Sequence, residues 1–422
     1  MNLTIRILLG MGLGLVLGSS IQAAEFDPSH WVHVYLVGGL IDAGGQIFVR
    51  SLQLMVVPLV FVSLVCGAAS LSATDSIGRV AGKTVALYLF TTAVAISIAL
   101  LLATIVQPGA GVAPASLGTD FQPAEPTSIK DTLVSIIPTN PVSAMAEGRM
   151  LQIILFALLL GLALSRSGQA GRRLAGVFDD LNEALMKLIT LLIKLAPIGV
   201  FCLMAKLFAT LGWSEITRLL QYFLTVVGAL LIHVTLVYPT LLMVLGRVSP
   251  IRFFGKMREP LLVAFSTASS GATLPVTLRT VEERVGVKNE VASFVVPLGA
   301  TINMDGTAIM QGVATVFIAQ LYGIELGMSQ FLIIILTATM ASVGTAGVPG
   351  VGMIMLVMVL EQVGLPLDGI VFILAVDRLL DMLRTAVNVA GDGMVATVVA
   401  RSENELDLDT FEDPDAGRVI GS

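Results

Sequence analysis

Residues 377–392 read DRLLDMLRTAVNVAGD and lie within an otherwise apolar segment that runs from Ile370 to Ala400. The segment carries polar side chains at separations of 4, 3, 1, 3 and 4 residues: Asp377, Asp381, Arg384, Thr385, Asn388 and Asp392. This spacing places them on one face of a helix. Ionisable groups in such number are hard to explain as packing, so the segment predicts a membrane span with a functional polar stripe. The alternative is that these groups only form internal salt bridges.

The composition of the whole chain also predicts a membrane protein. Of the 422 residues, 55% are hydrophobic and only 13% are charged, and the mean hydropathy is +0.91. A soluble domain carries roughly a quarter charged residues. The net charge of −6 mainly reflects the C-terminal end, because seven acidic residues fall between Glu403 and Asp415. We expect this acidic tail, residues 403–422, to be solvated and partly disordered.

Apolar segments long enough to cross a bilayer occur at residues 3–24, 36–70, 83–107, 140–165, 180–209 and 217–246. We expect the proline-rich residues 108–140 to form an extramembrane connection that leads into an interrupted fourth span. Lys and Arg collect in alternate connections, at 79–83, 166–173 and 247–258, which predicts that these connections and both termini are cytoplasmic. The first segment also has features of a cleaved signal peptide, but the spans that follow favour an uncleaved first helix. We therefore predict a multi-pass protein of the cell, or inner, membrane.

Residues 261–278 are only moderately apolar, and their flanks, Arg258 and Arg279, both have the character of cytoplasmic residues. A segment that enters and leaves on the same side is a re-entrant hairpin, which is tolerated only inside protein or beside a water-filled cavity. Its tip, Ala268 to Thr273, supplies hydroxyl groups and free backbone groups. The alternative is that these small residues only allow close packing of membrane helices.

A second interrupted segment spans residues 331–360 and contains SVGTAGVPG at 342–350, through which no ordinary helix continues. Its flanks carry acidic residues but no Lys or Arg, so we expect this hairpin to enter from the outside. A hairpin followed by a helix thus occurs twice, with opposite entry sides. Inverted repeats of this kind are typical of secondary transporters, whose sites lie at the repeat interface.

The helix expected over residues 291–322 has Asn303, Asp305 and Gly306 at its middle. We expect Gly306 to let the helix unwind and free carbonyl oxygens, which together with carboxylate and amide oxygens suit a hard cation. The alternative is a kink with a structural Asp. On the last span, Arg384 suits a carboxylate and Asp381 suits an ammonium group, while Asp392 suits a cation. An amino acid with an acidic side chain offers both groups at once.

These residues resemble the glutamate transporter family, the dicarboxylate/amino acid:cation symporters that include archaeal sodium/aspartate transporters and excitatory amino acid transporters. The resemblance covers nearly the whole chain and depends on four motifs in the family's order: Ser269 to Pro275, Asn303 to Thr307, Gly344 to Gly350, and Asp381 to Thr385 continuing to Asn388 and Asp392. It implies an all-α polytopic membrane protein with eight transmembrane helices, two re-entrant helical hairpins, inverted repeats and an elevator-type mechanism.

The resemblance also implies a homotrimer whose chains each have two parts. The scaffold would comprise residues 1–75 (spans 1 and 2) and 111–216 (spans 4 and 5). The transport domain would comprise residues 76–110 (span 3) and 217–402, which hold span 6, a hairpin at 253–286, span 7, a hairpin at 328–362 and span 8. The hairpin tips would act as gates, and residues 403–422 would form an acidic cytoplasmic tail.

The family's motifs imply specific ligand contacts. Arg384 would bind the substrate's side-chain carboxylate and Asp381 its amino group, in a pocket completed by Ser269, Ser270, Thr307, Val348, Gly352, Thr385 and Asn388. One sodium site would use Gly299, Asn303, Asn388 and Asp392; a deeper one would use Tyr88, Thr91, Thr92, Asn303 and Asp305; a third would use Thr301, Ser342, Val343 and Thr345. Sodium ions are then co-transported ligands, and no cofactor or nucleic acid is expected. Membrane lipid is an expected partner.

Two positions depart from the family pattern. Gln311 stands where mammalian glutamate carriers have a proton-accepting glutamate, so proton cotransport through this residue is not expected. An arginine that archaeal relatives place at position 268, and mammalian ones at 382, is absent, since these residues are Ala268 and Met382. Arg378, one turn before Asp381, is the candidate substitute.

The predicted function is therefore not enzymatic: it is sodium-coupled symport of aspartate or glutamate. A C4-dicarboxylate:cation symporter, which would leave Asp381 unpaired, and a proton-coupled glutamate transporter are the alternatives. A neutral amino-acid exchanger would leave Arg384 unpaired. An ion channel would need no substrate arginine beside a cation site. A membrane enzyme or redox subunit is disfavoured because the three histidines and two cysteines are scattered.

Overall fold

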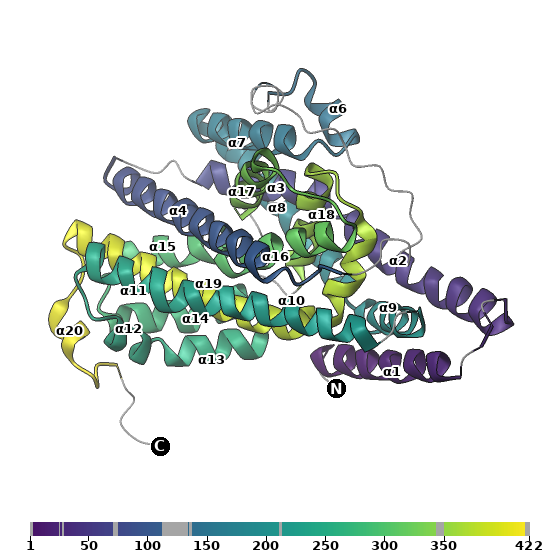
Figure 1. The fold of residues 1–422 in the computed structure, drawn as a ribbon. Coiled ribbons are helices and arrows are strands. Elements are labelled where there is room, and N and C mark those ends of the chain that lie inside the picture. The colour runs from purple at the N-terminus through teal and green to yellow at the C-terminus, as the bar shows by residue number, and fades with distance from the viewer. Residues whose placement is uncertain are drawn as a thin grey trace.

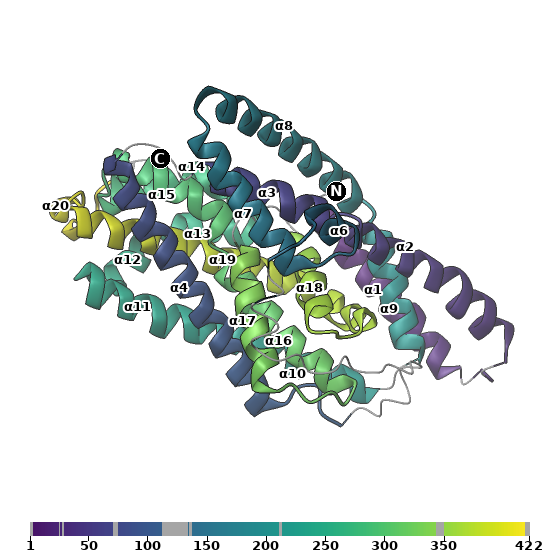
Figure 2. The same ribbon diagram turned by 90° about the horizontal axis from the view of Figure 1, so that it is seen from above.

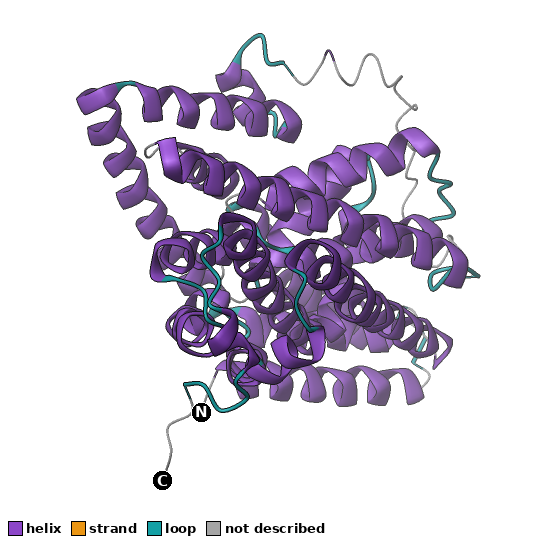
Figure 3. Ribbon diagram, turned by 90° about the vertical axis from the view of Figure 1, so that its left-hand side faces the viewer, coloured by secondary structure: helices purple, strands orange, loops and turns teal. Residues whose placement is uncertain are grey.

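The structure, a computed structural model, describes residues 3–24, 26–27, 29–70, 75–111, 134, 137–210, 213–342 and 350–417. These residues are helical almost throughout (Figure 3), and the β-pairing among them is a single isolated bridge between Val287 and Leu406. The prediction of an all-α fold is confirmed.

The first half of the chain forms a bundle of apolar helices. Its elements are α1 (Leu3–Ala23), the π-helical η1 (Val32–Ile41), α2 (Asp42–Gln53), α3 (Val56–Ser70), α6 (Pro141–Ala146), α7 (Met150–Arg166), α8 (Gly168–Ile193) and α9 (Ala196–Thr210). Helix α1 packs along α9, and α3 packs on α7 and α8. Helices α1, α2 and α9 lie together at one end of the molecule (Figures 1 and 2). We call these elements the N-terminal bundle.

Glycines let the helices of the N-terminal bundle approach closely. A Cβ atom added at Gly14 would lie 2.5 Å from the carbonyl oxygen of Phe201 on α9, and one added at Gly18 would lie 2.5 Å from that of Ala205. On α7, a Cβ atom at Gly161 would lie 2.5 Å from Cβ of Ala68 on α3. Small residues at such contacts are typical of helix packing in membranes, where backbone approach and van der Waals contact hold helices together.

The second half of the chain surrounds one long helix. Its elements are α10 (Trp213–Ile232), η3 (His233–Val237), α11 (Tyr238–Leu241), η4 (Leu242–Gly246), α12 (Pro250–Lys256), α13 (Arg258–Thr267), α14 (Ser270–Thr280), η5 (Val281–Val285), α15 (Asn289–Ile302), α16 (Asp305–Leu321), α17 (Met328–Ser342), α18 (Val351–Gln362), η6 (Leu367–Gly369), α19 (Ile370–Glu403) and α20 (Leu408–Glu412). Helices α10, α13, α15 and α16 all pack on α19. We call these elements, together with α4 (Asp75–Val106), which packs on α16 and α17, the C-terminal bundle.

Both predicted hairpins have two helical arms. In the first, α13 ends at Ala268 with φ of +51°, and the side chain of Ser269 caps α14 by accepting a hydrogen bond from the backbone N–H of Ala272. In the second, α17 and α18 pack against each other, and α18 is preceded by Gly350 with φ of +85°. The tip of the second hairpin, residues 343–349, lies outside the described residues.

Three described helices are long and apolar enough to cross a membrane: Ile5–Ala23, Arg79–Val106 and Thr217–Gly246. Two predicted single spans, 36–70 and 180–209, are wrong as continuous helices, because the chain breaks near residues 54–55 and 194–195, whereas the break near residues 147–149 agrees with the predicted interruption of the fourth span. Pro58 and Pro197 lie in the first turns of α3 and α9, where a proline fits a helix start but blocks continuation from the preceding turn. Gly148, with φ of +68°, ends α6.

The helix predicted over residues 291–322 unwinds before Asp305 and not at Gly306, where we expected the break. Asn303 and Met304 have extended or irregular backbone angles between α15 and α16, while Gly306 lies within the first turn of α16. Gly306 instead allows close approach to α19, because a Cβ atom there would lie 2.5 Å from the carbonyl oxygen of Arg384.

The acidic tail is also more ordered than its composition predicts. Residues after Glu403 fold into the bridge at Leu406 and the helix α20, which lies beside α12 (Figure 1). Glu405 and Glu412 pair with basic side chains of the fold, as described below, while Asp407, Asp409, Asp413 and Asp415 are exposed, so the acidic side chains remain accessible to solvent.

Buried polar side chains are distributed unevenly between the two bundles. Among the side chains that the structure describes, every buried polar or charged one lies on α4 or beyond Trp213. The N-terminal bundle contributes none to this set. The chemistry of the molecule is therefore concentrated in the C-terminal bundle.

Candidate functional site

A wide helical turn aims two side chains at one carboxylate. The segment His233–Val237 is π-helical, and the backbone N–H of Tyr238 donates to the carbonyl oxygen of His233. In this i to i+5 geometry the two residues lie one above the other, whereas in an α-helix a separation of five would place them on different faces. Both side chains consequently reach Asp305, and their rings are 4.7 Å apart.

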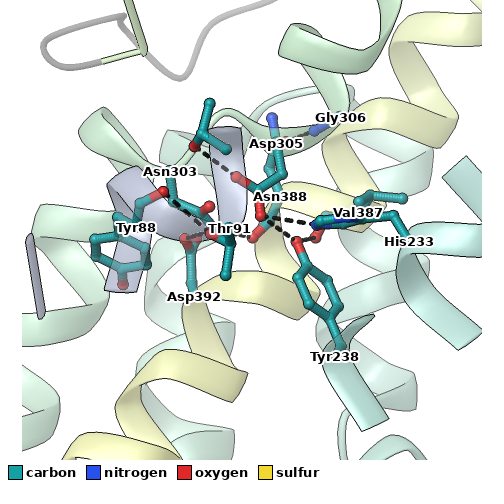
Figure 4. Close-up of polar contacts among 11 residues, drawn as sticks. Tyr88, Thr91, His233, Tyr238, Asn303, Asp305, Gly306, Val387, Asn388 and Asp392 are labelled. Carbon is teal, nitrogen blue, oxygen red and sulfur yellow. Dashed lines mark hydrogen bonds and ion pairs between the residues drawn. The ribbon is translucent and has the colours of Figure 1, made fainter. Parts of the chain in front are cut away.

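Asp305 is the centre of this cluster (Figure 4). Its Oδ1 atom accepts a hydrogen bond of 2.6 Å from the hydroxyl of Thr92 on α4, and its Oδ2 atom accepts one of 2.9 Å from the hydroxyl of Tyr238. The Nε2 atom of His233 lies 3.1 Å from the same Oδ2. All four side chains are buried. The carboxylate is at the first turn of α16, where the helix dipole favours negative charge.

The second buried carboxylate of this region belongs to Asp392, on the polar face of α19. The amide nitrogen of Asn303 donates to Oδ1 of Asp392 at 2.9 Å and to the carbonyl oxygen of Asn388 at 2.8 Å (Figure 4). The backbone of Gly299 touches this carboxylate, because a Cβ atom there would lie 2.5 Å from Oδ1 of Asp392. Gly299, Asn303, Asn388 and Asp392, which were predicted as one sodium site, are thus brought together.

The deeper predicted set is brought together in part. The hydroxyl of Thr92 bonds to Asp305, which directly follows the unwound residues Asn303 and Met304. The hydroxyl of Thr91 donates to the carbonyl oxygen of Tyr88 at 3.1 Å, and the Tyr88 hydroxyl donates to that of Val295, also at 3.1 Å. Tyr88 and Thr91 are thus buried beside this region with their hydroxyls bound to backbone oxygens.

This region is rich in oxygen atoms and poor in positive charge. Asp305 and Asp392 are both buried, and among the described residues neither forms an ion pair with Lys or Arg. The Oδ1 atom of Asn303 is also buried, and it has no hydrogen-bond partner within the described part of the chain. An uncompensated buried carboxylate is strongly unfavourable. A bound cation or proton would supply the missing charge, and the orphaned amide oxygen fits a hard cation.

The other half of the polar stripe carries compensated charges. Arg384 is completely buried, with Nη1 2.8 Å from Oδ1 of Asp377 and Nη2 2.9 Å from Oδ1 of Asp381. Arg378, the candidate substitute arginine, lies 3.6 Å from Oδ2 of Asp381. The alternative of internal salt bridges therefore applies to these four residues but not to Asp392.

Arg384 lies where several predicted substrate residues meet. A Cβ atom at Gly352, on the returning arm of the second hairpin, would lie 3.1 Å from Thr307 and 3.4 Å from Nη2 of Arg384. The side-chain oxygen of Asn388 accepts a 2.7 Å hydrogen bond from the backbone N–H of Gly306. The hydroxyl of Thr385 donates to the carbonyl oxygen of Asp381 at 2.7 Å. Gly352 of the second hairpin thus lies next to the guanidinium group of Arg384.

The first hairpin contributes two buried serines at the start of α14. Ser269 and Ser270 are 8% and 4% exposed, and both arms of this hairpin pack on α19. The serines therefore lie at the hairpin tip within the protein, as a re-entrant segment requires.

The third predicted sodium site is not assembled from the described residues. Thr301 is exposed, and its hydroxyl donates to the carbonyl oxygen of Leu298 at 2.9 Å. Ser342 is buried at the end of α17 and donates to the carbonyl oxygen of Thr339 at 2.7 Å. Val343 and Thr345, and Val348 of the predicted substrate pocket, lie outside the described residues.

Sequence reasoning missed two members of the Asp305 cluster, His233 and Tyr238. An ionisable side chain inside a span is itself a functional signal, and His233 occupies such a position. The contact of Tyr238 could not be found from spacing, because it depends on the wide turn between the two residues. Gln311 is buried on α16, and its side-chain oxygen has no partner in the described region.

Comparisons with known proteins give a consistent result over nearly the full length. A family profile described as the sodium:dicarboxylate symporter family matches residues 3–402. The proton/glutamate-aspartate symporter of Escherichia coli (strain K12) is 38% identical over 417 residues, which cover 96% of this chain and 94% of the relative. The proton/sodium-glutamate symport protein of Bacillus caldotenax is 34% identical, with 95% and 94% covered. The excitatory amino acid transporter 3 of Mus musculus is 32% identical, with 95% and 85% covered.

Proposed function

The chain belongs to the sodium:dicarboxylate symporter family, and we propose that it is a sodium-coupled symporter that carries aspartate or glutamate into the cell. The observation that carries this proposal is the pairing of buried Arg384 with Asp381 at 2.9 Å, beneath Gly352 of the second hairpin. This pair presents a cation and an anion side by side, which matches a substrate that has both charges.

Binding of an acidic amino acid would exchange one ion pair for two. The substrate's side-chain carboxylate would take the place of Asp381 on the guanidinium group of Arg384, while its ammonium group would pair with the released Asp381. Arg384 and Asp381 would both keep a partner, which matters because an unpaired buried charge is strongly unfavourable, and the substrate's α-carboxylate would depend on hydrogen bonds from the pocket. Ser269, Ser270, Thr307, Thr385 and Asn388 would supply hydrogen bonds around the substrate, and Val348 at the second hairpin tip would help to close over it.

Cation coupling is supported by the oxygen-rich region around Asp305 and Asp392. Asp305 and Asp392 are buried without a Lys or Arg partner among the described residues, so one or more cations would balance them during transport. We propose sodium, because carboxylate, amide and backbone oxygens gather there and because Gln311 cannot carry a proton. Thr301, Ser342, Val343 and Thr345 would form a further sodium site. A proton is the alternative, since the E. coli relative is named as a proton symporter.

We further propose an elevator mechanism in a homotrimer embedded in membrane lipid. Residues 1–75 and 111–216 would form the static scaffold, and residues 76–110 and 217–402 would move. The division is supported by the absence of buried polar side chains from the described N-terminal bundle. Both termini would be cytoplasmic in a multi-pass protein of the inner membrane.

Transport of C4-dicarboxylates is the second candidate, and one contact favours it. A dicarboxylate has no ammonium group for Asp381, but Arg378 lies 3.6 Å from this carboxylate and is itself only 14% exposed. Arg378 would partly neutralise Asp381 when Arg384 binds the substrate.

Uptake into proteoliposomes tests these proposals. We would measure radiolabelled L-aspartate, L-glutamate and succinate with an inward sodium gradient, with potassium alone and with a proton gradient. Sodium-driven uptake of the amino acids is expected, together with its loss in Arg384→Ala. Arg279→Ala, which removes an exposed arginine paired with Glu259, is the matched control. Uptake driven by protons alone would overturn sodium coupling, and uptake of succinate alone would select the dicarboxylate alternative.

A further inference from the structure

The chain after α19 returns to the base of the first hairpin. Helix α19 ends at Asn404, which has φ of +61° and reverses the chain direction. The backbone N–H of Lys288 then donates to the carbonyl oxygen of Glu405 at 3.0 Å, and the backbone N–H of Asp407 donates to that of Gly286 at 2.8 Å. Residues 404–417, which we call the C-terminal strap, are thus bonded to the connection between the first hairpin and α15.

A buried lysine holds the strap to the hairpin. Lys256, at the end of α12, is only 3% exposed. Its Nζ atom donates to the carbonyl oxygens of Arg284 at 2.6 Å, Asp413 at 2.7 Å and Thr410 at 2.8 Å. An ammonium group has three N–H donors, and each has an acceptor here. One acceptor belongs to the returning arm of the hairpin and two belong to the strap.

The strap also has an apolar anchor and a charged rim. Phe411 is completely buried, with its ring centre 5.9 Å from Nζ of Lys256. Around it, Lys288 pairs with Glu405 at 2.6 Å, and Arg252 pairs with Glu412. The rim pairs are largely exposed, and exposed ion pairs add little to stability. The buried lysine and phenylalanine should therefore dominate the attachment.

We propose that the C-terminal strap, locked by Lys256, joins the first hairpin to the last helix and that Lys256 is a positioning residue for substrate binding. This inference rests on the proposed transport function. The hairpin carries Ser269 and Ser270 at its tip, and α19 carries Asp381 and Arg384. The strap connects the C-terminal end of α19 to the base of the first hairpin. We infer that it limits how far the two serines can move from Arg384.

Releasing the strap should lower substrate affinity rather than turnover. If the hairpin samples arrangements in which its serines are misplaced, only a fraction of the molecules can bind, and the apparent affinity falls by that fraction. We expect Lys256→Met to raise the KM for the transported amino acid about three- to tenfold with kcat per reconstituted protein changed less than about twofold. Lys256→Arg retains the charge and donors and should fall between wild type and Lys256→Met.

The test measures uptake kinetics and hydrogen exchange on the full-length chain. Lys187→Met is the matched control, because Lys187 is an exposed lysine whose ion pair with Glu183 lies within α8. Phe411→Ala should loosen the strap without changing any residue of the hairpin. It is the second test variant, for use if Lys256→Met fails to fold. Both strap variants should raise KM and speed exchange at residues 281–288 and 404–417, while exchange in α1 and α9 stays unchanged.

Two results would overturn the proposal. One is an unchanged KM in the folded strap variants, and the other is faster exchange across the whole protein. Exchange is measured without substrate, so it reports on the strap even if wild-type protein transports no acidic amino acid. That last outcome would refute the proposed function, whereas normal wild-type uptake with unchanged KM in the variants would refute only the positioning role.

Discussion

The two bundles of this protein hold their helices together in different ways. In the N-terminal bundle, α1 meets α9 at Gly14 and Gly18, where side-chain volume is absent and backbones nearly touch. In the C-terminal bundle, α4, α11, α16 and α19 meet around Asp305 and Asn303, whose hydrogen bonds join these elements. Both solutions suit an environment in which burial of apolar surface between helices gives little driving force.

The difference has a functional consequence. Close backbone contact requires a fixed fit and tolerates no ligand between the helices, whereas polar groups that lack a full set of partners can exchange them for ions or substrate. The N-terminal bundle is thus suited to remain unchanged, and the C-terminal bundle is suited to bind. Substitutions in the two bundles should separate stability from affinity.

The largest effect is expected from Arg384→Ala. The substitution removes the proposed substrate contact, the arginine paired with Asp377 and the nearer of the two arginines beside Asp381, and breaking a buried pair costs about 3 to 5 kcal/mol. Uptake should fall at least about 100-fold, since every 1.4 kcal/mol is a factor of ten. Uptake normalised to reconstituted protein measures this.

Lys206→Ala provides the comparison from the N-terminal bundle. Lys206 pairs with Asp42 at 2.7 Å, but its side chain is 42% exposed, so the pair should contribute little. We expect an unchanged KM and a small change in melting temperature. A loss of uptake similar to that of Arg384→Ala would contradict the assignment of binding to the C-terminal bundle.

A second effect should appear in the dependence on sodium. Asn303→Ala removes the donor to Asp392 and the orphaned amide oxygen at once. The sodium concentration for half-maximal uptake should rise about tenfold, the equivalent of one lost interaction of 1.4 kcal/mol. Ser293→Ala on α15, the helix that precedes Asn303, is the control, because its exposed hydroxyl donates to the carbonyl oxygen of Asn289 on the same helix. An unchanged sodium dependence with reduced substrate affinity would move Asn303 from the ion site to the substrate site.

Alanine substitutions in α1 should affect stability alone, and in opposite directions. Gly12 has open space at the Cβ position, so Gly12→Ala should stabilise the helix by about 0.5 to 1 kcal/mol. Gly14→Ala would force α1 away from α9 and should destabilise by about 1 to 3 kcal/mol. Thermal unfolding in detergent measures both. Equal shifts in melting temperature for the two variants would exclude close α1–α9 contact.

The smallest effect concerns pH and the C-terminal strap. The Thr410 hydroxyl and the backbone N–H groups of Thr410 and Asp409 lower the pKa of Asp407, and the Lys83 ammonium lowers the pKa of Glu403. Because these pKa values are lower in the folded state, the ionised carboxylates stabilise the strap at pH values above the unfolded pKa values of about 4. This stabilisation is lost as the pH falls through the folded pKa values. Hydrogen exchange of residues 404–417, corrected for intrinsic rates, should therefore be constant from about pH 5 to 8. A change within this range would point to another titrating group.

Sequence reasoning predicted the parts of the fold that depend on composition and spacing. The polar face of α19 and the two helical arms of each hairpin region followed from residue types along one element, whereas the break within residues 291–322 was expected at Gly306 and lies at Asn303 and Met304. The breaks within the predicted spans were harder to predict, because Pro58 and Pro197 lie within long apolar segments. The order of the tail could not be predicted either, since it depends on Lys256, more than 140 residues earlier in the chain.

The site was predictable as a set of residues but not as a set of contacts. Spacing placed Asp377, Asp381 and Arg384 on one face, yet it could not show that Arg384 would be shared between both carboxylates. Nor could it separate this compensated group from Asp392. That separation depends on distances between elements, which a single helical pattern does not contain.

The π-helical turn at His233–Val237 affects how sequences of related chains should be compared. Removal of one residue there would restore ordinary α-helical winding and rotate everything after it by about 100°. Tyr238 would then leave Asp305 although every residue type had been kept. A single-residue gap at this point of an alignment would thus mark a relative whose buried aspartate has lost a hydroxyl donor, and such gaps inside a membrane helix should be treated as informative changes of function.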